Sequence, residues 1–315
     1  MTDGETPERK GDCVFRIPWI AAVAVSAALT FCARAEDRFF DSDGVRIRYL
    51  DQGQGEPVVL IHGFTGNADI GWTLNRVLPT LSLEYRVIAL DCRGHGRSDK
   101  PHDPQAYGAK MAEDIVRLLD HLKIEKAHLV GYSMGGLITL KIALTYPQRV
   151  ISAIPAGYGW PADGKPAGKD FLEALAASLE AGQGVGPLLE ALQPADQPPM
   201  TAEQVAAVNT MVLSSNDAKA LAAVIRGFKG LDVDEKLVRA NQVPVLSIIG
   251  GNDPLKVDVD RLAAAMPGLK VVTIPNADHG QAMFHPDFLS AVREFLAAHR
   301  AKPAAENPAA KTTNP

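Results

Sequence analysis

Short aliphatic runs recur through the first half of this chain and constrain its fold more than any other feature. Such runs are typical of strands buried on both faces of a parallel sheet. An alternating run, Val45–Leu50, predicts a half-exposed strand ahead of them, and helical patterns at about 70–81, 104–122 and 134–146 lie between them. This repetition of strand and helix predicts a doubly wound α/β sheet. The runs are Pro57–Ile61, Tyr85–Leu90, Ala127–Val130 and Val150–Ile154.

The rhythm stops at residues 156–240, where Gly, Pro and Ala abound and only helical patterns occur, at about 168–181, 201–213 and 216–228. Strand and helix then resume in Val243–Ile249, Val259–Met266, Lys270–Ile274 and Pro286–His299. The simplest interpretation is one α/β core, 36–155 and 241–300, with a helical lid, 156–240, inserted between two core strands. Residues 301–315 lack an apolar period, and we expect a disordered tail.

The first 35 residues resemble an export signal. Ile17–Phe31 is apolar and uncharged, and Ala33-Arg34-Ala35 has the small residues that a signal peptidase accepts. The run is short for a membrane span, which needs about 20 residues. We therefore expect cleavage after Ala35 and a periplasmic or secreted protein. An uncleaved membrane anchor at residues 17–33 and a mistaken start codon remain open.

The net charge bears on the partners of the chain, and the cysteine count bears on disulfide formation. The net charge of -5 gives no bulk electrostatic attraction to nucleic acid, so the expected partner is a small-molecule substrate. Three cysteines are present, Cys13, Cys32 and Cys92. Cleavage after Ala35 leaves only Cys92, which excludes an intrachain disulfide. If the signal is cleaved, we expect no stable membrane insertion. The oligomeric state stays open.

Gly131-Tyr132-Ser133-Met134-Gly135 stands after a buried strand and before a helix. G-x-S-x-G in that context indicates a nucleophile elbow, a sharp turn that holds the serine hydroxyl above the sheet edge. The glycines avoid collisions with neighbouring backbone, and the helix N-terminus at Met134 provides positive dipole where an oxyanion forms. The motif predicts Ser133 as a nucleophile.

Three further segments, with this motif, resemble the α/β-hydrolase fold serine hydrolases, an esterase-like family with a helical cap. The resemblance covers nearly all of residues 38–299. His62-Gly63-Phe64 follows a buried strand as the family's oxyanion loop does, and Gly250-Gly251-Asn252-Asp253 ends a later strand where the family carries its acid. The third segment resembles the D-x-R-G-x-G-x-S loop and is Asp91-Cys92-Arg93-Gly94-His95-Gly96-Arg97-Ser98.

The resemblance implies His279 as the general base, because it lies beyond the strand Lys270–Ile274 and before the last helix. The family more often has glycine before this histidine, whereas Asp278 stands here. His285 is the rival, but it adjoins Pro286, where a capping or exposed role is expected. The chain order serine, acid, histidine fits the fold.

Asp253 is the preferred acid, because it follows the strand that ends at Ile249, and it would orient the imidazole of His279. Asp258 and Asp260 compete, but carboxylates at a helix start are common for dipole reasons alone. The backbone N–H groups of Phe64 and Met134 would form the oxyanion hole.

Other polar residues near these motifs are expected to support loops. His62, Asp91, Arg93 and His95 are interpreted as loop-bracing groups, with proton transfer by His62 a minor alternative. No metal is expected, since no pair of His or Cys has ligand spacing backed by carboxylates. No cofactor is expected, because neither phosphate-loop nor dinucleotide motifs follow a strand.

A serine at the elbow, rather than aspartate, favours acyl transfer to water through an acyl-enzyme. The sequence therefore predicts a carboxylesterase-like enzyme acting on small to medium apolar acyl substrates, with Trp160 from the lid as a substrate-binding residue. A carbon–carbon bond hydrolase, a lactonase, an amidase or peptidase, and an acyltransferase use the same triad and stay open. A non-catalytic binding protein is the alternative from another class.

Overall fold

The computed structural model describes residues 36–161 and 169–300. Its larger sheet has the order β1-β2-β4-β3-β5-β6, in which β3, β4, β5 and β6 pair in parallel and β1 and β2 are antiparallel. The strands are β1 (Arg38–Ser42), β2 (Val45–Gln52), β3 (Pro57–Ile61), β4 (Arg86–Leu90), β5 (Ala127–Tyr132) and β6 (Val150–Ala156).

A second parallel pair, β7 (Leu246–Gly250) and β8 (Lys270–Ile274), continues beyond β6, to which a single bridge from Ala153 to Val245 connects it. The sheet is thus mostly parallel, as the aliphatic runs predicted. The ranges predicted for β3 and β8 coincide with the observed strands. The strand predicted at Val243–Ile249 starts later, at Leu246.

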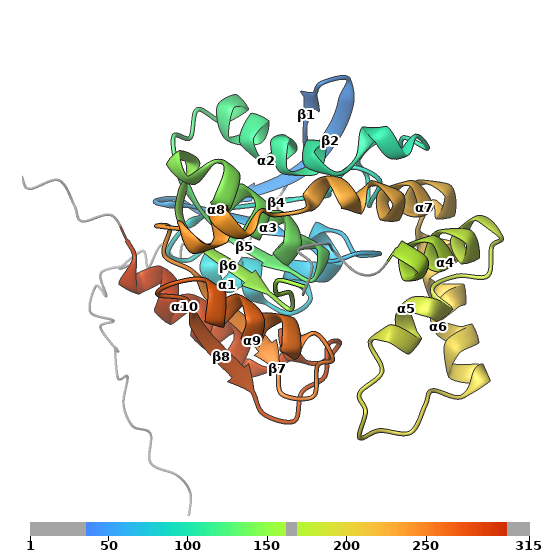
Figure 1. Cartoon of the computed structure of the whole chain (residues 1–315). Coiled ribbons are helices and arrows are strands. Elements are labelled where there is room, and N and C mark those ends of the chain that lie inside the picture. The colour runs from blue at the N-terminus through green and yellow to red at the C-terminus, as the bar shows by residue number, and fades with distance from the viewer. Residues whose placement is uncertain (1–35, 162–168, 301–315) are drawn as a thin grey trace, which may run out of the picture. The chain divides into compact units, whose positions relative to one another are not determined.

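Helices cover both faces of this sheet, as a doubly wound fold requires (Figure 1). The core helices are α1 (Val77–Leu81), α2 (Ala109–His121), α3 (Met134–Thr145), α9 (Lys256–Ala265) and α10 (Pro286–Ala298). Short helical turns are η1 (Asp69–Thr73), η2 (Pro104–Ala106), η3 (Pro147–Arg149) and η5 (Ala282–Phe284).

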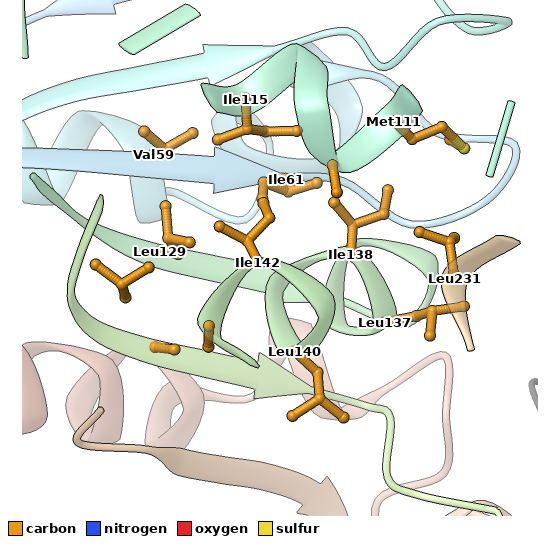
Figure 2. Close-up of a cluster of buried hydrophobic side chains, with 14 of the residues drawn as sticks. Val59, Ile61, Met111, Ile115, Leu129, Leu137, Ile138, Leu140, Ile142 and Leu231 are labelled. Atoms are coloured by element: carbon orange, nitrogen blue, oxygen red, sulfur yellow. The ribbon is translucent and has the colours of Figure 1, made fainter. Parts of the chain in front are cut away.

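Strand β3 shows how the two faces are filled. Its alternate residues Val59 and Ile61 belong to the apolar cluster that includes α2 and α3, which Figure 2 shows. Val58 and Leu60 belong to the cluster that includes α1 and α10. Because successive side chains of a strand point to opposite faces, a wholly apolar run is what burial on both faces demands.

Two predicted helices are shorter than their patterns. The helix predicted at 70–81 is interrupted before α1, where Arg76 has a φ of 64° and the Asn75 side chain accepts a hydrogen bond from the N–H of Val77 at 3.2 Å. The helix predicted at 104–122 begins only at Ala109, because Gly108 has a φ of 68°. Backbone in the left-handed region cannot continue an α-helix.

Between β6 and β7 the chain forms helices and no strand among its described residues, as predicted. They are α4 (Lys169–Glu180), α5 (Gly186–Ala191), α6 (Ala202–Ser215), α7 (Ala218–Gly227), η4 (Phe228–Leu231) and α8 (Glu235–Arg239). We call residues 169–240 the cap segment. Its small apolar cluster is formed by Leu175, Ala176, Leu179, Val185, Val212, Leu221, Ala222 and Ile225. The action of this segment as a lid stays a prediction.

The predicted signal or anchor, residues 1–35, and the predicted tail, 301–315, lie outside the described residues. Within the part of the chain that is described, no helix combines the length and apolar character needed to cross a membrane.

Candidate active site

Ser133 stands at the turn between β5 and α3 in a backbone conformation that side chains rarely adopt. Its φ is 55° and its ψ is -116°. The turn is anchored on both sides, since the Ser133 N–H donates to the Ala156 carbonyl at 2.8 Å and the Ser133 carbonyl accepts from the Leu137 N–H at 3.0 Å. Strain that persists in a well-anchored turn is typical of functional sites.

The flanking glycines are needed because the turn brings backbone segments into contact. A Cβ atom on Gly131 would lie 2.0 Å from the Gly135 carbonyl oxygen, and one on Gly135 would lie 1.9 Å from the Ile61 carbonyl oxygen. No side chain fits at such distances. The G-x-S-x-G spacing is therefore a packing requirement of the turn, as the sequence suggested.

The structure brings Ser133, His279 and Asp253 together from three separate loops. His279 Nδ1 lies 2.7 Å from Asp253 Oδ2, and His279 Nε2 lies 3.0 Å from Ser133 Oγ. Since a carboxylate only accepts hydrogen bonds, Nδ1 carries the imidazole proton and Nε2 is left to accept the serine hydroxyl proton. Such an arrangement can activate a hydroxyl for nucleophilic attack.

Both partners of Ser133 are removed from solvent. Asp253 is 3% exposed and His279 is 9% exposed. The other Asp253 oxygen, Oδ1, accepts a hydrogen bond from the Leu255 N–H at 2.9 Å, which fixes the orientation of the carboxylate. The competing acid Asp258 lies in the first turn of α9, where it pairs with Arg261 at 2.6 Å. His285 accepts a hydrogen bond from the Asp287 N–H as the N-cap of α10, as predicted.

Tyr132, the variable residue of the elbow motif, also contacts His279, and no pattern in the sequence indicates this contact. Its hydroxyl donates to the His279 carbonyl at 2.5 Å, and the two rings lie 5.4 Å apart. Its ring packs edge-on against Phe288 of α10. β5 thus positions both the serine and the loop of the histidine.

The loop that carries Phe64 lies against the serine. A Cβ atom on Gly63 would be 3.5 Å from Ser133 Cβ. Among the described residues, the N–H groups of Phe64 and Met134 have no hydrogen-bond acceptor. Free amides beside a predicted nucleophile are what an oxyanion hole needs, and that role stays a prediction for both N–H groups.

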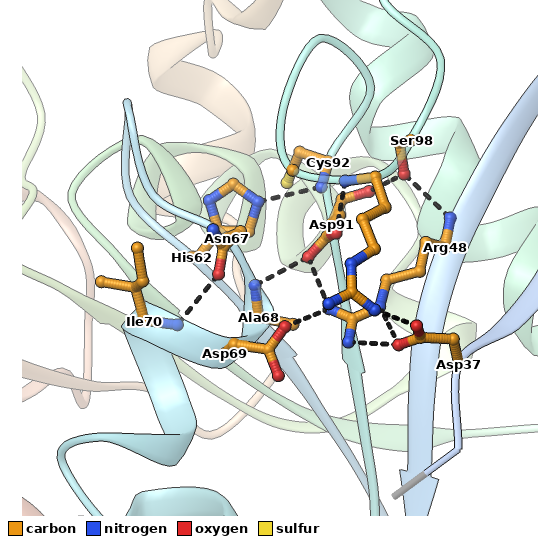
Figure 3. Close-up of polar contacts among 12 residues, drawn as sticks. Asp37, Arg48, His62, Asn67, Ala68, Asp69, Ile70, Asp91, Cys92 and Ser98 are labelled. Atoms are coloured by element: carbon orange, nitrogen blue, oxygen red, sulfur yellow. Dashed lines mark hydrogen bonds and ion pairs between the residues drawn. The ribbon is translucent and has the colours of Figure 1, made fainter. Parts of the chain in front are cut away.

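A buried polar network supports this loop (Figure 3). Asp91 accepts hydrogen bonds from the N–H groups of Ala68 and Arg97, both at 2.8 Å, and pairs with Arg48 at 3.1 Å. Arg48 is 1% exposed and also pairs with Asp37 and Asp69. The strand predicted as half-exposed at Val45–Leu50 is more buried than its alternation indicates, because a hydropathy pattern does not register the ion pairs that allow Arg48 to be buried.

The histidines near the site brace loops, as predicted. His62 Nδ1 donates to the Gly63 carbonyl at 2.8 Å, and its Nε2 accepts from the Cys92 N–H at 2.9 Å. Both nitrogens are thus occupied in the neutral form. Burial lowers the pKa of His62, and burial together with the nearby His62 lowers the pKa of His95 to about 3.

Arg93 joins its loop to α2 through Asp114, with the nearest atoms 2.5 Å apart. Among the described residues, no group of three or more His, Cys, Asp or Glu is arranged to hold a metal ion.

An open cleft of about 600 Å³ reaches His279, a volume typical of small-molecule sites. Its walls come from the cap segment, between Leu189 and Gln204, and from Asp278 to Gly280 of the loop after β8. Trp160 does not line this cleft. It is 7% exposed within the core cluster, and its backbone N–H donates to the Asp258 carbonyl. A role of Trp160 in substrate binding stays a prediction.

Comparison with known proteins places this geometry in context. A family model described as alpha/beta hydrolase fold matches residues 56–157. The dihydrolipoyllysine-residue acetyltransferase component of the acetoin cleaving system of Cupriavidus necator is 43% identical over 134 residues, 40% of this chain and 34% of that protein. The 2-hydroxy-6-oxononadienedioate/2-hydroxy-6-oxononatrienedioate hydrolase of Paraburkholderia xenovorans is 41% identical over 126 residues, 39% of this chain and 43% of that protein.

The chain thus matches only 34% and 43% of the length of these two curated relatives. A solved structure covers more. Est816, described as an N-acyl homoserine lactone degrading enzyme, is 29% identical with a TM-score of 0.67, and the match covers 82% of this chain and 100% of that one. The family model spans the strands from β3 to β6 and the solved structure most of the chain, so this protein has the α/β-hydrolase fold.

Proposed function

We propose that this chain is a serine hydrolase that cleaves a carboxylic ester through an acyl-enzyme. The observation that carries the proposal is the continuous hydrogen-bonded series from Asp253 through His279 to Ser133, at 2.7 and 3.0 Å. A buried carboxylate, an imidazole of defined tautomer and a strained serine at a helix N-terminus are the parts that activate a hydroxyl nucleophile.

In the first half of the reaction, Ser133 Oγ attacks the ester carbonyl carbon while its proton passes to His279 Nε2. The N–H groups of Phe64 and Met134 stabilise the oxyanion of the tetrahedral intermediate, and each such donor is worth about 2.7–4 kcal/mol of barrier. The carbon–oxygen bond to the alcohol then breaks. His279 returns the proton to the leaving oxygen.

In the second half, water attacks the acyl-enzyme, and His279 takes the proton that water loses. The bond between the acyl carbon and Ser133 Oγ breaks, and the serine regains its proton as the carboxylic acid leaves. Asp253 stays ionised throughout and stabilises the imidazolium form of His279.

Hydrolysis of short p-nitrophenyl esters tests the proposal. Ser133→Ala should reduce kcat on the order of 10⁶-fold, because removing the nucleophile of a triad removes nearly all of its effect. Mass spectrometry should show a fluorophosphonate probe attached to Ser133. Full activity of the alanine variant would refute the proposal, and absence of labelling would favour a binding protein without catalysis.

The names of two similar proteins suggest two alternative classes of substrate. Est816 is described as degrading a lactone, which is a cyclic ester and needs the same steps on the same three residues. The Paraburkholderia xenovorans relative is named for a dienedioate with a 6-oxo group, and hydrolysis next to that carbonyl would cleave a carbon–carbon bond. Lactones and such oxo acids should therefore be assayed beside the simple esters.

The location outside the cytoplasm is also a proposal. Residues 1–35, whose sequence favours export, lie outside the described residues. Expression of the full chain in a bacterium, followed by fractionation and mass spectrometry, tests it. Glu36 as the mature N-terminus supports cleavage, whereas an intact protein in the membrane fraction supports the anchor at residues 17–33.

A further inference from the structure

The cleft that reaches His279 is lined mainly by apolar and uncharged polar side chains, with one carboxylate among them. Six of its lining residues are apolar and come from the cap segment: Leu189, Leu192, Pro194, Pro198, Pro199 and Met200. Gln193, Gln197, Thr201 and Gln204 add uncharged polar groups. The only ionisable side chain that lines the cleft beside His279 is the carboxylate of Asp278, among the described residues.

Asp278 is held in place by its own turn. Its Oδ1 accepts hydrogen bonds from the N–H groups of Gly280 and Gln281, both at 2.9 Å, and the side chain is half-buried. These two hydrogen bonds fix the position of the carboxylate beside the cleft. No lysine or arginine is among the described lining residues to offset that charge.

A second carboxylate, Asp196, stands near the same wall. Its Oδ2 lies 3.3 Å from the Asn252 side chain, and it belongs to the exposed loop between Pro194 and Pro198. Asp253 adds a buried negative charge behind His279, at 2.7 Å from the imidazole. Three carboxylates therefore lie at or near the part of the cleft that reaches His279, and they should repel an approaching negative charge.

Building on the proposed function, we propose that this cleft selects uncharged apolar esters or lactones and discriminates against acyl groups that carry a carboxylate, with Asp278 as the specificity-determining residue. The dienedioates named for the Paraburkholderia xenovorans relative carry two carboxylates and belong to the disfavoured class. An N-acyl lactone, the class named for Est816, carries none.

Two p-nitrophenyl esters of equal acyl length test this inference, the butyrate and the hemisuccinate, which differ by a terminal carboxylate. The wild-type protein should prefer the butyrate in kcat/KM by on the order of 10-fold, as expected for two charges several ångströms apart at a partly solvated site. Raising the ionic strength from about 0.02 M to about 0.5 M should narrow that preference, because salt screens the repulsion.

Asp278→Asn should reduce the preference on the order of 10-fold, by raising the relative rate with the hemisuccinate. Asparagine keeps the Oδ1 acceptor, so the turn is retained while the charge is removed. A change in the basicity of the adjacent His279 alters both rates by the same factor and cancels in their ratio. The matched control is Asp287→Asn, which removes an exposed charge from the first turn of α10 and should leave the ratio unchanged.

A wild-type preference for the hemisuccinate, or an Asp278→Asn ratio equal to that of the wild type, overturns the inference. If labelling of Ser133 and butyrate hydrolysis persist in that case, the proposed hydrolase function stands and only the charge selection fails. If neither ester reacts and Ser133 is not labelled, the hydrolase proposal fails and the inference fails with it.

Discussion

The sheet core and the cap segment are stabilised by different kinds of contact. The core has two large apolar clusters, one on each face of the sheet, and buried ion pairs such as Arg93 with Asp114. The cap segment has one small cluster of its own, contributes a few side chains such as Leu231 to a core cluster, and has exposed ion pairs such as Arg226 with Glu173 and Glu180. Exposed pairs contribute little to stability, so most of the free energy of unfolding resides in the core.

One of the contacts between the two regions is at the loop of Phe64. Its ring packs against Phe228 of the cap segment, with centroids 6.3 Å apart, and the Thr65 carbonyl accepts a hydrogen bond from Asn216 at 3.3 Å. Ser133, His279 and Asp253 lie wholly on core loops, whereas most of the cleft wall belongs to the cap segment and only Asp278 to Gly280 come from the core. The proposed chemistry therefore depends on the core, and most of the apolar lining of the cleft depends on the cap.

Between the core and the cap, the largest expected difference is that between a core acid and a cap acid. Asp253→Asn should lower kcat by about 10⁴-fold with little change in folding, because an amide stabilises the wrong imidazole tautomer. Asp196→Asn in the cap should leave kcat with a neutral ester within about threefold, since a distant exposed charge alters a barrier only slightly. Steady-state kinetics with p-nitrophenyl butyrate measures both. Equal losses would show that the division between core and cap is wrong.

The same substitution of a buried leucine by alanine should affect stability differently in the core and in the cap segment. Leu60 in β3 and Leu179 in α4 are both fully buried. Leu60→Ala should destabilise the whole fold by about 2–5 kcal/mol. Leu179→Ala should loosen the cap locally, raising KM while the main thermal transition of the core moves less.

Thermal unfolding followed by circular dichroism, combined with limited proteolysis, distinguishes these outcomes. Early cleavage within the cap segment of the Leu179→Ala variant supports local opening. A drop in Tm equal to that of Leu60→Ala would mean that core and cap unfold as one cooperative unit.

Acid should weaken the core through its buried histidines. The pKa of His95 is lowered to about 3, so between that value and about 6.5 the unfolded chain binds the extra proton. The stabilisation is complete above pH of about 6.5 and is lost as the pH falls toward 3, at about 1.4 kcal/mol per pH unit for one histidine. Urea unfolding at a series of pH values measures this slope.

His95→Asn should flatten that slope by one proton, whereas the control His102→Asn, at an exposed site, should leave it unchanged. A steep slope retained by the His95 variant would assign the acid sensitivity to other groups.

The smallest expected effect concerns the link between β5 and the histidine loop. Tyr132→Phe removes the hydroxyl that donates to the His279 carbonyl and should lower kcat by about tenfold with KM unchanged, because a loosened base spends less time in reach of Ser133. Tyr107→Phe is the matched control, since its buried hydroxyl donates to the Pro101 carbonyl, also at 2.5 Å. An equal fall in kcat for both variants would mean that the hydrogen bond of Tyr132 has no specific effect on His279 and that any buried tyrosine hydroxyl matters as much.

The sequence predicted those parts of the molecule whose residue pattern is compatible with only one local structure. Apolar runs such as Pro57–Ile61 can only be buried strands in this context, and a serine between Gly131 and Gly135 requires the tight turn that is observed. The three residues proposed for catalysis were named from motif and chain order, and the structure brings them within hydrogen-bonding distance.

Other features depend on contacts between distant segments, which local patterns do not contain. Arg48 is buried because Asp91 stands 43 residues later, and Tyr132 reaches His279 across 147 residues. Helices α5 and α8 have six and five residues, too few to give a periodic pattern. The cleft could not be predicted from the sequence either, since its walls come from two stretches that lie far apart in the chain.

The pairing of β7 with β8 has a consequence for how the protein matures. Asp253 and His279 each follow one of these strands, and the register that sets Gly250 opposite Ile274 fixes the spacing between acid and base. Ser133 lies 146 residues before His279, so a ribosome completes the elbow long before the chain contains its base. A chain that still lacks His279 lacks the proposed base, so the hydrolysis proposed above requires that β7 and β8 have paired.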